Sequence, residues 1–127
     1  MGRKVEDEYD SNCIKKHFKG RRMTLEQLQI AIREETGVLL YFSGENCNVC
    51  HALRPKFKEV FDKEFPKIKQ IYLDAHIHAD ISAHYQVFSV PTMIVFLDGR
   101  EFIREGRSVS LHQMTEQLKR PYGMMSE

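Results

Sequence analysis

Two cysteines three positions apart are the residues of this chain best suited to chemistry. They lie in the stretch Glu45-Asn46-Cys47-Asn48-Val49-Cys50-His51, between an apolar run and a segment with apolar residues at helical spacing. A Cys-X-X-Cys pair at such a strand-to-helix corner favours thiol–disulfide exchange, but the same letters match a c-type haem attachment motif and half of a zinc site. The helices and strands predicted around the pair indicate which of these three kinds of site it forms.

The segment before the pair predicts a helix and then a buried strand. Thr24 and Gln27 have capping-box spacing, so we expect a helix over residues 24–35, and Gly37 is placed to end it in a left-handed conformation. Residues 38–42 form a short, continuous apolar run, which is typical of a strand covered on both faces in a parallel arrangement. The cysteine pair therefore follows a strand of the protein interior.

The segment after the pair predicts a long helix and a second strand. Apolar residues recur at helical spacing over residues 48–64, and Pro55 lies among them. Because the apolar stripe continues in phase past Pro55, we expect a kink at this proline and not a break. Residues 68–74 predict a strand, and the histidine-rich residues 75–85 predict a loop with a short helix.

The last third of the chain predicts a hairpin and a final helix. Asp98-Gly99 is a strong two-residue hairpin signal between strands expected over residues 93–97 and 101–104. A last helix is expected over residues 110–120, ended by Pro121. Alternating elements followed by a hairpin predict an α/β domain with a mixed β-sheet flanked by helices.

The composition fits one globular domain. The chain has 127 residues, of which 42% are hydrophobic and 29% charged. Residues 1–22 hold seven of the 19 basic and four of the 18 acidic side chains, so the body of the chain is slightly acidic and a general nucleic-acid surface is not expected. We expect a polar, mobile extension at residues 1–22, a domain at 23–121 and a tail at 122–127.

Export and membrane insertion are not expected. The first 22 residues contain no apolar segment, and the longest purely apolar run is five residues. Three cysteines in a chain of this size do not suggest a disulfide scaffold, and Cys13 is interpreted as a spectator thiol. These features favour the cytoplasm, with the periplasm as the alternative if a signal has been removed.

Over residues 24–120 the order of elements resembles the thioredoxin family. Four landmarks match in order: the pair Cys47 and Cys50, Pro55 in the helix, Pro91 before its strand, and Gly106 near the end of the last strand. The resemblance implies a thioredoxin-like fold with the CxxC at the N-terminus of a long kinked helix.

The resemblance also implies how a substrate is bound. In the family reading, Pro91 is cis and packs against the cysteines, which leaves the Val90 backbone free to pair with an extended substrate segment. Asn46 and Gly106 are expected to complete this substrate-binding surface.

Three residues depart from the family pattern. Asn46 stands where the family usually has a tryptophan, Tyr41 stands where thioredoxins commonly have a buried aspartate, and Tyr72 corresponds best to a lysine often found near it. The site therefore lacks the usual buried proton acceptor for the second thiol. Tyr41, Tyr72 and His51 are candidate modulators of thiol pKa, and the chain is interpreted as a divergent family member.

The expected chemistry is thiol–disulfide exchange. Reduction of protein disulfides is favoured over their oxidation only because the first 22 residues lack the apolar segment of a signal peptide. Cys47, at a helix N-terminus, is placed to react as a thiolate, and Cys50, one turn further along, is placed to resolve the mixed disulfide. We expect no bound cofactor and no metal, protein disulfides as substrates, electrons from an NADPH-dependent thioredoxin reductase, and a monomer that binds neither nucleic acid nor membrane.

Three alternatives remain. A thioredoxin-fold redox sensor or binding module would use the disulfide to control one partner without multiple turnover. Haem attachment at Cys47 to His51 would need an exported chain and an open pocket, and a zinc site would need ligands from downstream residues, for which the usual spacing is absent. The downstream candidates are His76, His78, His84 and Asp74, and we expect these histidines to be loop surface.

Overall fold

A computed structural model describes residues 22–125 of the chain. The predicted N-terminal extension, apart from Arg22, and Cys13 lie outside the described residues. The elements, in chain order, are α2 (Leu25–Glu34), β1 (Gly37–Ser43), α3 (Asn48–Glu64), β2 (Ile68–Asp74), α4 (Ala79–His84), β3 (Thr92–Leu97), β4 (Arg100–Glu105) and α5 (Leu111–Met125). This order of helices and strands confirms the predicted one.

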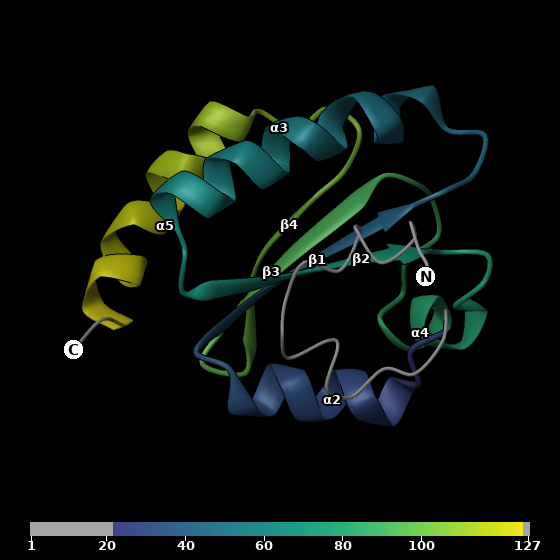
Figure 1. The fold of residues 1–127 in the computed structure, drawn as a ribbon, viewed down its shortest axis with the longest axis horizontal. Helices are drawn as coiled ribbons and strands as arrows, with labels where there is room; N and C mark the ends of the chain where they lie inside the picture. The colour runs from purple at the N-terminus through teal and green to yellow at the C-terminus, as the bar shows by residue number, and fades with distance from the viewer. Residues whose placement is uncertain (1–21, 126–127) are drawn as a thin grey trace.

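The four strands form one mixed sheet in the order β2-β1-β3-β4. Strand β1 pairs with β2 in parallel and with β3 in antiparallel orientation, and β3 and β4 form the predicted hairpin. Helices α2 and α4 cover one face of the sheet, and α3 and α5 cover the other (Figure 1). None of the helices in the described part of the chain is long and apolar enough to cross a membrane.

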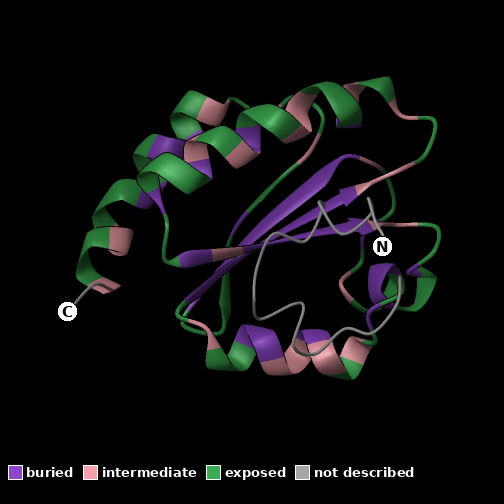
Figure 2. Ribbon diagram, in the orientation of Figure 1, coloured by how far each residue is buried: buried purple, intermediate pink, exposed green. Residues whose placement is uncertain are grey.

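Strand β1 contributes to a separate apolar core on each face. Its residues from Gly37 to Phe42 are all buried. Val38, Leu40 and Phe42 pack with residues of α2 and α4, whereas Leu39 and Tyr41 pack with residues of α3 and α5. In Figure 2 the strands β1, β2 and β3 are almost wholly buried, whereas β4 and the outer faces of the helices are mostly exposed. The continuous apolar run of this strand follows from burial on both sides.

The start of α2 confirms the prediction, but its end does not. The Thr24 side chain accepts a hydrogen bond from the Gln27 N–H, and the Gln27 side chain accepts one from the Thr24 N–H. The helix is capped by Glu35 in an extended conformation, so the expected left-handed ending at Gly37 is wrong. Gly37 instead begins β1, where an added Cβ would come within 2.9 Å of Ile68 Cγ1. Close strand packing is what requires glycine there.

Helix α3 and the β3–β4 turn lie at the residues predicted for them, and the kink at Pro55 stays a prediction. Helix α3 spans Asn48–Glu64 and is continuous through Pro55, so the proline does not break it. Asp98 and Gly99 both have positive φ angles, 56° and 81°, as a two-residue turn with the twist of the strands requires.

The last helix is longer than expected. Pro121 does not end α5, which continues to Met125, so residues 122–125 are helical where we expected a tail. The Tyr122 ring lies 5.1 Å from the Phe65 ring, and the Tyr122 hydroxyl accepts a hydrogen bond from the Lys67 N–H at 3.0 Å. Tertiary contacts therefore hold the last turn even though proline removes a helical hydrogen bond.

His78 is not on the surface as expected. Its side chain is 1% exposed, and its Nε2 atom accepts a hydrogen bond from the Met23 N–H at 3.1 Å. Its Nδ1 atom lies 3.0 Å from the Asp74 carbonyl oxygen and must therefore carry the proton. The neutral ring thus ties the start of the domain to the loop after β2. Among residues 22–125 no three His, Cys, Asp or Glu side chains are grouped to hold a metal ion.

The contacts of Tyr122 should contribute measurably to stability. We expect Tyr122→Ala to lower the free energy of unfolding by about 2 kcal/mol, because it removes a ring contact and a hydrogen bond. Urea denaturation followed by circular dichroism measures this. Met124→Ala, at a neighbouring side chain that is 63% exposed, serves as the control and should change stability by less than about 0.5 kcal/mol. Equal effects of the two substitutions would contradict a structural role for the last turn.

Stability should depend on the ionisation of His78. Burial lowers the pKa of His78, although the hydrogen bond to the Asp74 carbonyl opposes this shift. The folded state thus prefers the neutral ring, so its contribution is complete above about pH 6.5, the unfolded value, and is lost as pH falls through the lowered pKa. We expect the wild type to lose more stability than His78→Gln between neutral pH and pH 5 in urea titrations. His76→Gln, an exposed neighbour, is the control and should follow the wild type.

Candidate active site

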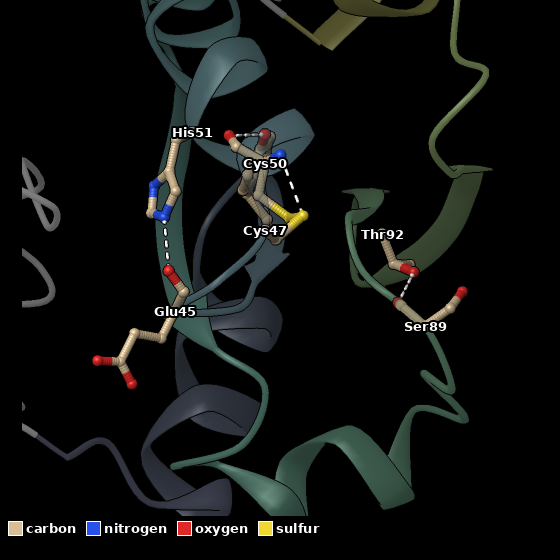
Figure 3. Close-up of a disulfide and its surroundings, with 7 residues drawn as sticks. Glu45, Cys47, Cys50, His51, Ser89 and Thr92 are labelled. Atoms are coloured by element: carbon tan, nitrogen blue, oxygen red, sulfur yellow. Dashed lines mark hydrogen bonds between the residues drawn. A yellow bond between two sulfur atoms is a disulfide. The ribbon is translucent and has the colours of Figure 1, made fainter.

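The two cysteines lie where β1 passes into α3. Cys47 is the N-cap of α3, and its sulfur accepts a hydrogen bond from the Cys50 N–H at 3.1 Å. The two residues form a disulfide, with their Cα atoms 5.2 Å apart (Figure 3). The N–H groups of the first helical turn have no partners within the helix, and here one of them is directed at the Cys47 sulfur. The same donor and the helix dipole favour a thiolate when the disulfide is reduced.

The two sulfurs differ in how far a substrate can reach them. Cys50 is fully buried, whereas Cys47 is partly exposed. Cys47 lines a surface hollow of about 550 Å³, together with Asn46, Val90 and Arg107 among other residues. A bulky disulfide can therefore approach Cys47, and Cys50 is reached only through it.

The segment before β3 forms the opposite wall of this hollow. The Val90–Pro91 peptide bond is cis, and the Thr92 hydroxyl donates a hydrogen bond to the Ser89 carbonyl at 2.7 Å. Val90 packs so closely on Gly44 that an added Cβ on that glycine would lie 3.3 Å from a Val90 methyl group. Figure 3 shows the Cys47 sulfur on the side of α3 that faces Ser89 and Thr92.

Gly106 also lies near this wall, because a Cβ added to it would be 3.7 Å from the Pro91 carbonyl oxygen. The structure thus brings Cys47 together with the four residues predicted for the substrate surface, which are Asn46, Val90, Pro91 and Gly106. Cys50 lies buried beneath them.

His51 is held on the other side of the corner. Its Nε2 atom lies 3.1 Å from the Glu45 carbonyl oxygen, and both residues lie on the side of α3 away from Ser89 and Thr92 (Figure 3). The ring thus closes the turn between β1 and α3. A role for His51 in tuning Cys47 stays a prediction.

Tyr41 supports the buried cysteine from below. The Tyr41 hydroxyl donates a hydrogen bond to the Cys50 carbonyl at 2.7 Å, and its ring contacts those of Phe57 and Tyr72. Burial raises the pKa of Tyr41 to about 12, although the nearby charge of Arg54 opposes this. The phenol is therefore neutral at ordinary pH and serves as a hydrogen-bond donor.

Tyr72 lies beside Tyr41, as the resemblance to the thioredoxin family implied. The two residues are partners in the β1–β2 register, and their ring centroids are 5.4 Å apart. The Tyr72 hydroxyl donates to the side-chain carbonyl of Gln70, whose amide donates to Asp62. This chain of hydrogen bonds satisfies the buried Gln70 and ties Tyr72 to the outer part of α3.

Comparison with known proteins gives the same identification as the geometry. The family model described as Thioredoxin matches residues 21–120. The chain belongs to the thioredoxin family. It is 36% identical over 99 residues to the thioredoxin-like protein YdfQ of Bacillus subtilis, an alignment that covers 78% of this chain and 88% of that protein.

Other relatives of this thioredoxin-family chain are more distant. It is 28% identical over 87 residues to the chloroplastic thioredoxin Y of Oryza sativa, covering 68% of this chain but only 52% of that protein. The solved structure of thioredoxin from Plasmodium falciparum superposes with a TM-score of 0.66 at 20% identity, over 72% of this chain and 91% of that one. At this identity the structural likeness supports the fold alone.

Family membership and the CxxC pair together indicate a thiol–disulfide oxidoreductase in general terms. The structure adds two residues to the site that the sequence did not single out. Arg107 lines the hollow of Cys47, and Phe88 lies in the loop before Val90 with 87% of its side chain exposed. The sequence signals for them were an arginine directly after Gly106 and a large apolar residue in a polar loop.

The Tyr41 hydroxyl should matter for stability and not for the ionisation of the attacking thiol. We expect Tyr41→Phe to lower the free energy of unfolding by about 1 kcal/mol, the typical net value of one hydrogen bond. The rate of reaction of the reduced protein with 2,2′-dithiodipyridine should keep the same midpoint between pH 5 and pH 9, because a phenol with a pKa of about 12 does not titrate there. A shifted midpoint in Tyr41→Phe would show that the hydroxyl tunes the thiolate.

Proposed function

We propose that this chain reduces protein disulfides, with Cys47 as the attacking thiol and Cys50 as the resolving thiol. The observation that carries the proposal is the difference between the two sulfurs. Cys47 caps a helix and opens on a surface hollow, whereas Cys50 is fully buried behind it. The first contact with a folded or extended protein substrate is therefore assigned to Cys47.

The reaction consists of two exchanges. The Cys47 thiolate attacks one sulfur of the substrate disulfide, so that a Cys47–substrate bond forms, the substrate S–S bond breaks and one substrate thiolate leaves. Cys50 then loses its proton and attacks the Cys47 sulfur, which forms the Cys47–Cys50 disulfide and releases the second substrate thiolate. Both leaving thiolates take up protons. The substrate gains two electrons, and the cysteine pair loses them.

Turnover requires a reductant for the Cys47–Cys50 disulfide. We assign this role to an NADPH-dependent thioredoxin reductase, and the substrates are protein disulfides. Reduction of substrates also requires a reducing compartment, so we assign the protein to the cytoplasm. We propose that it acts there as a monomer.

A redox sensor that acts on one partner is the second candidate. Tyr41 favours it, because the position under Cys50 holds a neutral phenol engaged with the Cys50 carbonyl. Because this phenol offers no base, we expect the proton of Cys50 to pass to water and the mixed disulfide on Cys47 to last longer. A long-lived mixed disulfide suits a dedicated partner better than rapid general turnover.

Insulin reduction coupled to NADPH oxidation by a thioredoxin reductase separates the two functions. Sustained turnover supports the reductase. Stoichiometric oxidation of the cysteine pair without turnover, even with dithiothreitol as the reductant, supports the sensor and overturns the general reductase.

The two cysteines should differ in their mutant behaviour. We expect Cys47→Ser to abolish reduction of insulin, and Cys50→Ser to accumulate a disulfide between Cys47 and insulin that non-reducing electrophoresis and mass spectrometry detect. Cys13→Ser is the control and should retain the wild-type rate. Similar, mild losses in the first two variants would contradict the assigned roles.

A further inference from the structure

We propose that this thioredoxin-family site selects an extended protein segment that carries an apolar side chain on one side of its reactive cysteine and an acidic side chain on the other. The apolar side chain packs against Phe88, and the acidic one pairs with Arg107. The inference rests on the proposed function, because it defines which protein disulfides Cys47 meets first.

Two surface hollows meet at Val90. The hollow of Cys47 has Val90 and Arg107 in its lining. A second hollow of about 460 Å³ has Val90 and Phe88 in its lining, together with small residues from both ends of α4, such as Ala79 and Ala83. A segment that runs along Val90 therefore passes from the hollow lined by Phe88 into the hollow lined by Cys47 and Arg107.

Phe88 is presented by a loop whose two ends are held in place. On one side, the Val87 N–H donates to the Ser82 carbonyl at 2.8 Å, and on the other, the Thr92 hydroxyl donates to the Ser89 carbonyl at 2.7 Å. Between these anchors the Phe88 side chain is 87% exposed, the largest exposed fraction among the large apolar residues of the described part of the chain. The chain has no tryptophan, and Phe88 is the large apolar aromatic residue in the linings of the two hollows.

Arg107 gives the hollow of Cys47 a positive charge. Within residues 22–125 its guanidinium group has no ion pair or hydrogen bond. Glu45, the acidic residue of the corner, lies on the side of α3 away from Ser89 and Thr92 (Figure 3), and it is not part of the lining of either hollow. An acidic side chain of a bound segment can therefore pair with Arg107 without competition from the corner.

The chemistry of the bound segment follows from these two contacts. An apolar side chain against Phe88 removes apolar surface of both partners from water. A carboxylate near Arg107 gains the modest attraction of an exposed ion pair and is steered toward the hollow of Cys47 at low salt. The exchange itself is unchanged: Cys47 forms the new S–S bond, and the second half of the substrate leaves as a thiolate.

Short peptides linked as disulfide dimers test the selection directly. Each peptide has one central cysteine in a glycine and serine background, with Leu or Ser on one side and Glu or Lys on the other, in both orders. The full chain, with its cysteine pair reduced, is mixed with each dimer, and the released peptide thiol is measured over time by chromatography. Reactions at low and at high salt separate the electrostatic contribution from the apolar one.

For Arg107 we expect the wild type to reduce the Glu peptides about threefold faster than the Lys peptides at low salt, and about equally fast at high salt. Arg107→Gln should remove this preference, Arg107→Glu should reverse it, and Arg107→Lys should keep it. Arg100→Gln, at an exposed arginine of β4 outside both hollows, is the matched control and should behave as the wild type.

For Phe88 we expect the wild type to reduce the Leu peptides about fivefold faster than the Ser peptides, at either salt concentration. Phe88→Ala should reduce this preference to near unity, and Phe88→Leu should retain most of it. Phe102→Ala, at a phenylalanine of β4 that is 46% exposed, is the matched control and should keep the wild-type preference.

The outcomes separate this inference from the proposed function. A circular dichroism spectrum and a number of titratable thiols after reduction equal to those of the wild type show that the fold and the cysteine pair of the Arg107 and Phe88 variants are intact. If the wild type reduces insulin but treats all peptides alike, or if Arg107→Gln or Phe88→Ala keeps the full preference, the inference is overturned and the reductase is not. If the wild type reduces neither insulin nor any peptide, the proposed function fails, and this inference fails with it.

Discussion

The burial of strand β1 on both of its faces is the constraint on which the rest of the structure depends. A strand with no exposed face needs a paired strand on each edge and a helical layer above and below. Strands β2 and β3 supply the edges, α2 and α4 one layer, and α3 and α5 the other. Burial ends at Ser43, so the chain reaches the surface at Gly44 and turns there into α3. The cysteine pair occupies this turn.

The helix that begins at this turn explains why the two cysteines are not equivalent. Cys47 occupies the capping position, where serine, threonine, aspartate or asparagine usually accepts the N–H of the first turn, and its sulfur does the same here. Cys50, in that first turn, points into the interior. Below it, Tyr41 donates a hydrogen bond to the Cys50 backbone. The phenol thus fixes the position of Cys50 without offering a base for its proton.

The parts of the fold that sequence patterns predicted well are those that depend on near neighbours along the chain. The box of Thr24 and Gln27, the apolar stripe of α3 and the turn at Asp98 and Gly99 each arise within a few residues, so spacing alone reveals them. The cysteine pair and Pro91 were found in the same way, because each has a recognisable local context.

The features that the sequence did not reveal depend on partners far along the chain. A side chain at position 37 would collide with Ile68. Helix α5 continues beyond Pro121, where the Tyr122 ring packs on the Phe65 ring. The buried His78 ring accepts a hydrogen bond from the Met23 N–H at the start of the domain. The spacing of histidines in the sequence does not indicate this contact.

The surface around Cys47 shows the same limit, since Phe88 and Arg107 belong to two separate loops that are distant from Cys47 in the sequence and line two hollows joined at Val90. Residue type alone marks neither of them as part of the site.

The turn between β3 and β4 has a practical consequence. The start of β1 pairs with the end of β3, so the exposed turn at Asp98 and Gly99 and the cysteine corner lie at opposite ends of the sheet. Seven residues of β1, at about 3.3 Å each, separate them by roughly 20 Å. A linker inserted at this turn would hold the protein on a bead or an electrode with its reactive sulfur facing the solution.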